Sequence, residues 1–161
     1  MLFIAIAWGT SLPIDHTASC TLVSHRSPAQ VRAIIADEPG SAKWRSDLSG
    51  VTARGGGMWV ESSKSGFQTT YLIVLRHDGS ITHTIVAQPD AAFAGSWTYS
   101  FAPQPGGRTS LTVVENGQIY NPVFRLLSRY MIGYTATMRR YLTDLSAALN
   151  EPAQVTCATG G

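Results

Sequence analysis

The stretch Glu115-Asn-Gly-Gln-Ile-Tyr-Asn-Pro122, which runs directly into Val123 to Leu149, decides the fold that we predict for this chain. Its first residues predict the end of a strand and a tight turn, and its last residues predict the start of a helix. Asn121 is a favourable N-cap because its side-chain oxygen can accept a hydrogen bond from an unpaired backbone amide. Pro122 then occupies the first helical turn, where a missing N–H costs nothing.

The helix predicted from Pro122 onward is long and amphipathic. Apolar side chains recur at alternating steps of three and four residues, which is the period of a helix with one apolar face: Phe124, Leu127, Met131, Tyr134, Met138, Tyr141, Leu145 and Ala148 or Leu149. On the opposite arc lie Arg125, Arg129, Arg139 and Arg140. Gly133 disfavours the helix by about 1 kcal/mol relative to Ala, which the apolar residues on both sides can offset, with a local bend. We therefore predict one helix of about 28 residues, roughly 42 Å long, whose apolar face needs a long apolar partner.

The residues before this helix predict mostly strands. Runs rich in Val, Ile, Thr and aromatic residues are separated by Gly, Pro, Asn and Asp, and they place strands at residues 16–26, 51–54, 58–63, 67–76, 80–87, 95–102 and 109–119. Asp78-Gly79 between two such runs is a strong hairpin signal. Two short helices are expected after the first strand, one from Ser27-Pro28 to Ala36 and one from Ser41 to Asp47.

The order of these elements predicts an α+β fold. The later strands follow one another without an intervening helix, so we expect an antiparallel meander. The predicted architecture is a curved antiparallel sheet of six to seven strands wrapped around the long C-terminal helix.

Length and composition indicate one domain. A chain of 161 residues can bury a substantial core. We divide it into an apolar, anchor-like segment at 1–13, a folded domain at 14–150 and a loose tail at 151–161. Only 14% of the residues are charged and the net charge is +2, which is too small to indicate a nucleic-acid partner. We expect a monomer.

The N-terminal segment and the two cysteines bear on location. Leu2 to Trp8 is apolar but much shorter than the roughly 20 residues that span a bilayer, so we expect either a cytoplasmic protein or one that associates with a membrane through this segment. Cys20 is expected as a buried side chain on a strand, and Cys157 as a free thiol in the tail. A disulfide between them would require an oxidising compartment.

Alternation along the strands predicts which side chains point inward. Successive side chains of a strand point to opposite faces, so three groups each share one face: Trp97, Tyr99 and Phe101; Phe67, Tyr71 and Ile73; and Leu111, Val113 and Glu115. These faces lie opposite the Tyr and Met residues of the predicted helix. The pattern leaves two readings open, a filled core or a cavity, because mixed aromatic and Met linings also suit adaptable apolar ligands.

Several motifs carry a resemblance to a known superfamily. They are Pro13-Ile-Asp-His16, Ser27-Pro28-Ala-Gln-Val31, Trp44-Arg-Ser-Asp47, Gly95-Ser-Trp-Thr-Tyr99, Glu115-Asn-Gly-Gln-Ile-Tyr-Asn-Pro-Val-Phe124 and Gly133-Tyr-Thr-Ala-Thr-Met-Arg-Arg-Tyr-Leu142. Together with the element order they resemble the START-like (SRPBCC, birch-pollen-allergen-like) superfamily with its helix-grip fold. The resemblance is to its bacterial branch with polyketide cyclase/dehydrase and lipid-transport domains. Members of this branch often carry a transmembrane helix before the position of Pro13, where this chain has only a short apolar segment.

The resemblance implies a hydrophobic cavity between the sheet and the long helix. We expect that cavity to be lined by Trp44, Phe67, Tyr71, Ile73, Trp97, Tyr99, Phe101, Leu111, Val113, Met131, Tyr134 and Met138. The resemblance does not fix one activity, because the fold serves binders, carriers and enzymes.

Candidate catalytic residues are few. The four histidines lack the spacing of a zinc site and the chain has no C-x-x-C motif, so we expect neither a metal nor another cofactor. Glu115 shares an inward face with apolar residues; it either pairs with Arg45 or with amides of the turn, or it acts as a general acid or base or a ligand anchor. His83 shares a face with Ile81 and Ile85, and it is either satisfied by a neighbour or reaches the cavity.

Three functions remain open at this point. The first is a binder or carrier of a small hydrophobic molecule, lipid-like or polyketide-like. The second is a cyclase or dehydratase type of enzyme that uses Glu115 or His83 with tyrosines as proton donors, namely Tyr71, Tyr99 or Tyr134. The third is a membrane-tethered interaction module with a filled core.

Overall fold

The computed structural model describes residues 10–88, 91–129 and 133–159. Within these residues eight strands form one sheet in the order β2-β3-β4-β5-β6-β7-β1-β8, and each neighbouring pair is antiparallel. The strands are β1 (Asp15–Ser24), β2 (Leu48–Gly55), β3 (Met58–Ser63), β4 (Gln68–Leu75), β5 (Ile81–Ile85), β6 (Phe93–Gln104), β7 (Arg108–Ile119) and β8 (Val155–Thr159). The predicted α+β helix-grip class is confirmed, with more strands than the six to seven expected.

Two short helices follow β1, as predicted. Ser27 begins α2 (Pro28–Ala36) with a capping box: its hydroxyl accepts from the Gln30 amide, and the Gln30 side chain accepts from the Ser27 amide. The second is the 3₁₀ helix η1 (Pro39–Lys43), which starts and ends earlier than the predicted segment from Ser41 to Asp47. Pro39 explains the early start, because proline favours the first position of a helix.

The predicted continuous C-terminal helix is wrong. The Asn121 cap is present, since its Oδ1 accepts hydrogen bonds from the amides of Val123 (2.9 Å) and Phe124 (3.2 Å). However, the helix that it starts, α3, ends at Leu127 (Pro122–Leu127), and a separate helix, α4, runs over Ala136–Ala148. Gly133 lies between them with φ of +80°, a left-handed conformation that an α-helix does not use and that glycine adopts readily.

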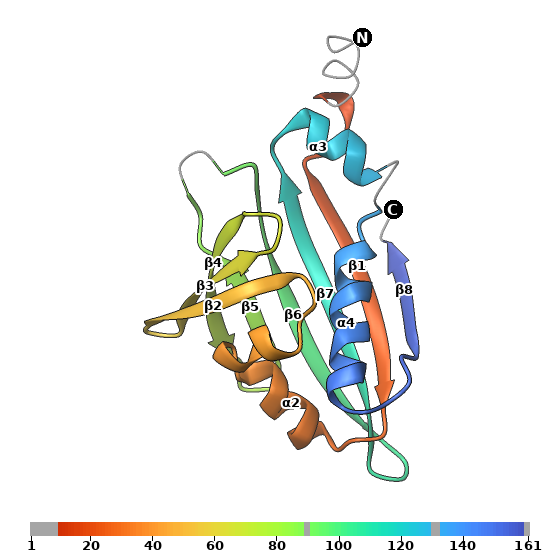
Figure 1. Ribbon diagram of the computed structural model, residues 1–161. Coiled ribbons are helices and arrows are strands. Elements are labelled where there is room, and N and C mark those ends of the chain that lie inside the picture. The colour runs from red at the N-terminus through yellow and green to blue at the C-terminus, as the bar shows by residue number, and fades with distance from the viewer. Residues whose placement is uncertain (1–9, 89–90, 130–132, 160–161) are drawn as a thin grey trace.

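Helix α4 supplies the apolar face that the sheet grips. Figure 1 shows α4 lying along the sheet beside β1 and β7, with α2 near one end and α3 at the other. Its buried side chains are Met138, Tyr141, Leu142, Leu145 and Ser146. The first four of these belong to a hydrophobic core that also contains Cys20, Leu22, Val31, Ile35, Tyr99, Leu111 and Val113. The apolar spacing of three and four residues therefore located this half of the predicted helix correctly.

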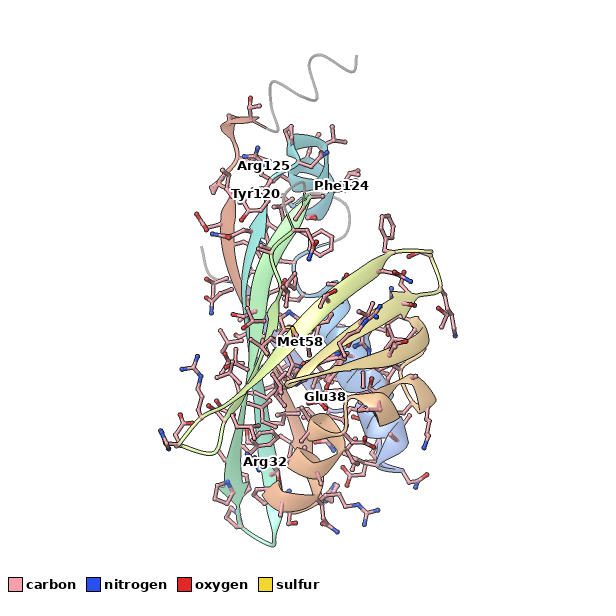
Figure 2. All side chains as sticks on the ribbon, turned by 90° about the vertical axis from the view of Figure 1, so that its left-hand side faces the viewer. Arg32, Glu38, Met58, Tyr120, Phe124 and Arg125 are labelled. Carbon is pink, nitrogen blue, oxygen red and sulfur yellow. A yellow bond between two sulfur atoms is a disulfide. The ribbon has the colours of Figure 1, made fainter. Side chains whose placement is uncertain are left out.

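Helix α3 does not continue the solvated face predicted for the arginines. Arg125 is only 7% exposed, and its guanidinium donates to the carbonyl oxygens of Leu12 (2.7 Å) and Tyr120 (3.4 Å). Phe124, predicted to face the core, is 43% exposed. Figure 2 shows Phe124, Arg125 and Tyr120 together at one end of the molecule. The break between the helices gives α3 its own orientation, which explains both errors.

The prediction of a loose tail is wrong for Val155–Thr159. This segment is strand β8, which pairs with β1 so that Cys157 lies opposite Cys20. The two cysteines form a disulfide, and the described residues contain no free cysteine. Cys157 is therefore not the free thiol that we expected. In the described residues no helix is long and apolar enough to cross a membrane.

Candidate ligand cavity

A cavity of about 580 Å³ opens between the concave face of the sheet and the region where α3 gives way to α4. Its volume lies within the range of small-molecule sites in proteins. Strands β3 to β7 contribute walls, and Leu127, Ser128, Gly133 and Tyr134 contribute the side next to the helices. Phe67, Phe93 and Phe124 line the cavity and are also exposed, so they lie at its opening. The core is therefore not filled at this end of the domain.

The sequence-predicted residues divide between this cavity and the core. Those that line the cavity are Phe67, Tyr71, His83, Trp97, Tyr99, Glu115 and Tyr134. Those that pack in or against the core instead are Trp44, Ile73, Phe101, Leu111, Val113 and Met138. Met131 lies outside the described residues. The division follows from the broken helix, because α4 packs into the core that holds the second group, whereas the cavity opens where α3 gives way to α4.

A buried ion cluster forms one wall. Arg45 donates from Nε and Nη2 to the two carboxylate oxygens of Asp47 (3.1 and 2.7 Å) and from Nη1 to Glu61 Oε1 (2.8 Å). The Trp59 indole also donates to Glu61 Oε1, at 3.2 Å. Arg45 is the partner of these two acids and not of Glu115, so the pairing considered for Glu115 does not occur. Both charged pairs are mostly buried, which makes the loss of either partner costly.

The pKa values in this cluster favour its charged form. Burial lowers the pKa of Arg45, but the hydrogen bond to Asp47 and the charges of Glu61 and Asp47 outweigh burial and raise that pKa above its ordinary value. Burial raises the pKa of Asp47, but the hydrogen bond and charge of Arg45 hold it below its ordinary value. Arg45 and Asp47 therefore stay ionised through the neutral range.

A second polar pair lies between β1 and β7. His16 Nε2 is 3.4 Å from Glu115 Oε1, and the two side chains are only 11% and 20% exposed. The imidazole stacks on the Tyr134 ring with a centroid distance of 4.3 Å. Burial raises the pKa of Glu115, and the charge and hydrogen bond of His16, with a hydrogen bond from Trp97, offset only part of that rise. The pair therefore places two titratable side chains in contact inside a largely apolar cavity.

Gly117 makes room for His16. A Cβ atom at position 117 would overlap the His16 imidazole, with Cε1 and Nε2 as the nearest atoms. His16 lies beside Gly117 in the register of β1 and β7. The imidazole is thus held between the Gly117 backbone and the Tyr134 ring, which fixes its position against Glu115.

His83 occupies a third polar position. Its ring contacts Trp59 edge-on and Tyr99 at a tilt, with centroid distances of 4.8 Å in both cases. Burial, with a smaller contribution from the charge of Arg45, lowers the pKa of His83 to about 4. The imidazole is therefore neutral at pH 7. Its Nε2 is buried and has no hydrogen-bond partner within the part of the chain that the structure describes.

Sequence reasoning missed four polar residues of the site, namely His16, Arg45 as a partner of two acids, Asp47 and Glu61. Two of them carried a usable signal. His16 shares its face of β1 with Ala18, Cys20 and Leu22, all almost fully buried, and Glu61 shares its face of β3 with Trp59. The same alternation that placed Glu115 inward would have placed these two inward as well.

An antiparallel sheet that curves around a C-terminal helix and leaves a cavity beside it defines a helix-grip, START-like protein. More narrowly, the chain belongs to the family described as polyketide cyclase / dehydrase and lipid transport, which matches residues 15–150. No curated protein matches the chain significantly.

Solved structures share the fold at low sequence identity. A START superfamily protein from Mycobacterium smegmatis is similar with a TM-score of 0.68 and 14% identity, over 84% of this chain and 97% of that one. An aromatase/cyclase from a Streptomyces species has a TM-score of 0.63 and 15% identity, over 84% of this chain and 92% of that one. Norcoclaurine synthase from Thalictrum flavum has a TM-score of 0.64 and 11% identity, over 91% and 92%. At these identities the likeness extends to the fold alone.

Proposed function

We propose that this protein binds a small amphipathic molecule, with the apolar body of the molecule in the cavity between the sheet and the helices. The observation that carries the proposal is the cavity of about 580 Å³, which has aromatic walls and three separate polar positions. Apolar burial, at roughly 25 cal/mol per Å², would supply most of the affinity. The polar side chains would orient the ligand. Membership of a family described by polyketide cyclisation and lipid transport supports the same class of ligand.

A second candidate function is acid–base catalysis in the same cavity. The His16–Glu115 pair supports it, because two titratable groups in contact inside an open cavity can take and return a proton. An aromatase/cyclase and norcoclaurine synthase share the fold. If the protein is an enzyme, Glu115→Gln should abolish turnover while ligand binding persists.

Uptake of the apolar dye Nile red tests the binding function. The wild-type protein should bind it saturably, with increased fluorescence. Thr69 and Thr70 are neighbours on β4, and only Thr69 lines the cavity. Thr69→Trp should therefore fill the space and abolish uptake, whereas the matched control Thr70→Trp should retain it. Equal uptake by the two variants, or no uptake by the wild type, would contradict the proposal.

Membrane association and the monomeric state remain proposals. Leu2 to Trp8 precedes an end of the domain where Ile14, Tyr120 and Phe124 are exposed, which supports contact with an apolar surface there. The disulfide supports an oxidising compartment instead of a reducing cytoplasm, because disulfides persist in such compartments. Co-sedimentation with phosphatidylcholine vesicles, with and without residues 1–9, tests membrane association. Light scattering during size exclusion tests the monomeric state.

A further inference from the structure

The charges that line the cavity do not balance. Among the described residues its carboxylates are Asp47, Glu61 and Glu115, and its guanidinium is Arg45. The remaining titratable side chains that face it are two histidines, His16 and His83, and three tyrosines, Tyr71, Tyr99 and Tyr134. Burial raises the pKa of Tyr71 and of Tyr99, so these phenols are neutral, as is His83. The charge of the cavity is therefore set by three acids, Arg45 and His16.

Arg45 is already committed to the two acids of its own wall. It donates to both oxygens of Asp47 and to Oε1 of Glu61, so it serves two carboxylates with one positive charge. Arg140 adds a positive charge near Asp47 from outside the cavity lining. Arg45 therefore has little capacity left to bind an anionic group of a ligand.

Glu115 is the carboxylate best placed to meet a ligand. Within the described part of the chain its ion-pair partner is His16, at a distance of 3.4 Å, and its side chain keeps 20% of its surface exposed. When His16 and Glu115 share one titratable proton, the pair is neutral overall. The cavity lining then carries one net negative charge, because Asp47 and Glu61 face the single positive charge of Arg45. The whole chain has a net charge of +2, so the cavity differs in sign from the molecule around it.

We propose that the ligand carries a hydrogen-bond-donating head without negative charge, an amine or a hydroxyl, that binds Glu115, and that the cavity excludes ligands with a carboxylate head. This inference rests on the proposed binding function and adds the class of ligand. A protonated amine is attracted electrostatically by the unbalanced carboxylates. A hydroxyl can donate a hydrogen bond to Glu115 without bringing a charge into the cavity. A carboxylate would lie near three acids in a medium of low dielectric constant, where repulsion is weakly screened.

Three ligands of one chain length test the proposal. Octylamine, octanol and octanoate are titrated at pH 7 against the protein loaded with Nile red, and displacement of the dye is followed by fluorescence. We expect octylamine to bind most tightly, octanol next, and octanoate more weakly than octylamine by on the order of tenfold or more. Because the protein is positive overall, general attraction to its surface would give the reverse order.

Two charge-neutralising variants sharpen the comparison. Glu115→Gln should narrow the difference in affinity between octylamine and octanoate, because a glutamine side chain cannot form the charge-assisted hydrogen bond that Glu115 offers to an ammonium head. Asp15→Asn is the matched control: Asp15 is the neighbour of His16 on β1, is exposed, and does not line the cavity. Asp15→Asn should leave the difference in affinity between octylamine and octanoate unchanged. The wild-type ranking needs no variant, so it tests the inference even if Glu115→Gln does not fold.

The outcomes separate the two proposals. If Nile red binds but octanoate displaces it as well as octylamine does, the inferred ligand class is wrong and the binding function stands. If Asp15→Asn narrows the gap as much as Glu115→Gln, the preference arises at the surface and the inference also fails. If neither the dye nor any of the three ligands binds, both proposals fall.

Discussion

Reduction of the Cys20–Cys157 disulfide should remove a large part of the stability of the domain. The bond joins strands β1 and β8 across a sequence separation of 137 residues. In the chain-entropy account, a cross-link over a loop of this length stabilises the folded state by about 5 kcal/mol at 25 °C. Single domains have unfolding free energies of roughly 5–15 kcal/mol, so the expected loss is a third of the total or more.

Urea unfolding followed by tryptophan fluorescence, with and without dithiothreitol, measures this loss. We expect the midpoint to fall sharply in the reductant. The double variant Cys20→Ala, Cys157→Ala is the control; it should unfold at the lower midpoint and show no response to dithiothreitol. The reasoning would be refuted if thiol titration showed complete reduction of the wild type while its midpoint stayed unchanged.

Other parts of the structure give further predictions. Leu145→Ala should lower the unfolding free energy by about 2–5 kcal/mol, because Leu145 is fully buried in the core. Arg139 lies on the exposed face of α4, so Arg139→Ala should lower the unfolding free energy by well under about 1 kcal/mol in the same denaturant assay. The pKa of His83, held at about 4 against an unfolded value of 6.5, means that the unfolded chain binds more protons between these values. The unfolding free energy should therefore fall by about 3 kcal/mol as the pH drops from 7 to 4. His83→Phe should remove this contribution to the pH dependence, which urea midpoints measured between pH 7 and pH 4 will show. Gly117→Ala should displace the His16 imidazole from the Tyr134 ring, and the NMR chemical shifts of the imidazole protons should then change; unchanged shifts would mean that the ring is not held as described.

The sequence was a good guide to the sheet and a poorer one to the final helix. Strand 58–63 was predicted with the bounds that β3 has, and the Asn121 cap forms as expected. The apolar periodicity, however, continues across Gly133, and one glycine costs too little for sequence reasoning to choose between a bend and a break. That choice depends on what α3 and α4 pack against, since tertiary contacts override propensity.

The site was predictable only in part, for a similar reason. Alternation placed Glu115 and His83 at the cavity, but their partners are set by the register between strands that are distant in sequence. Glu115 meets His16 because β1 lies beside β7, and Arg45, which precedes β2, meets Glu61 on β3. The disulfide likewise required β8 to pair with β1, which a short, isolated segment of five residues did not reveal.

A crystal structure of the protein soaked with octylamine tests the central claim most directly. We predict density for one ligand inside the cavity, with its chain between Tyr71, Trp97 and Tyr134 and its amine within hydrogen-bond distance of Glu115. A cavity that is closed in the crystal, or octylamine bound only on the outer surface while the cavity holds solvent, would contradict the account.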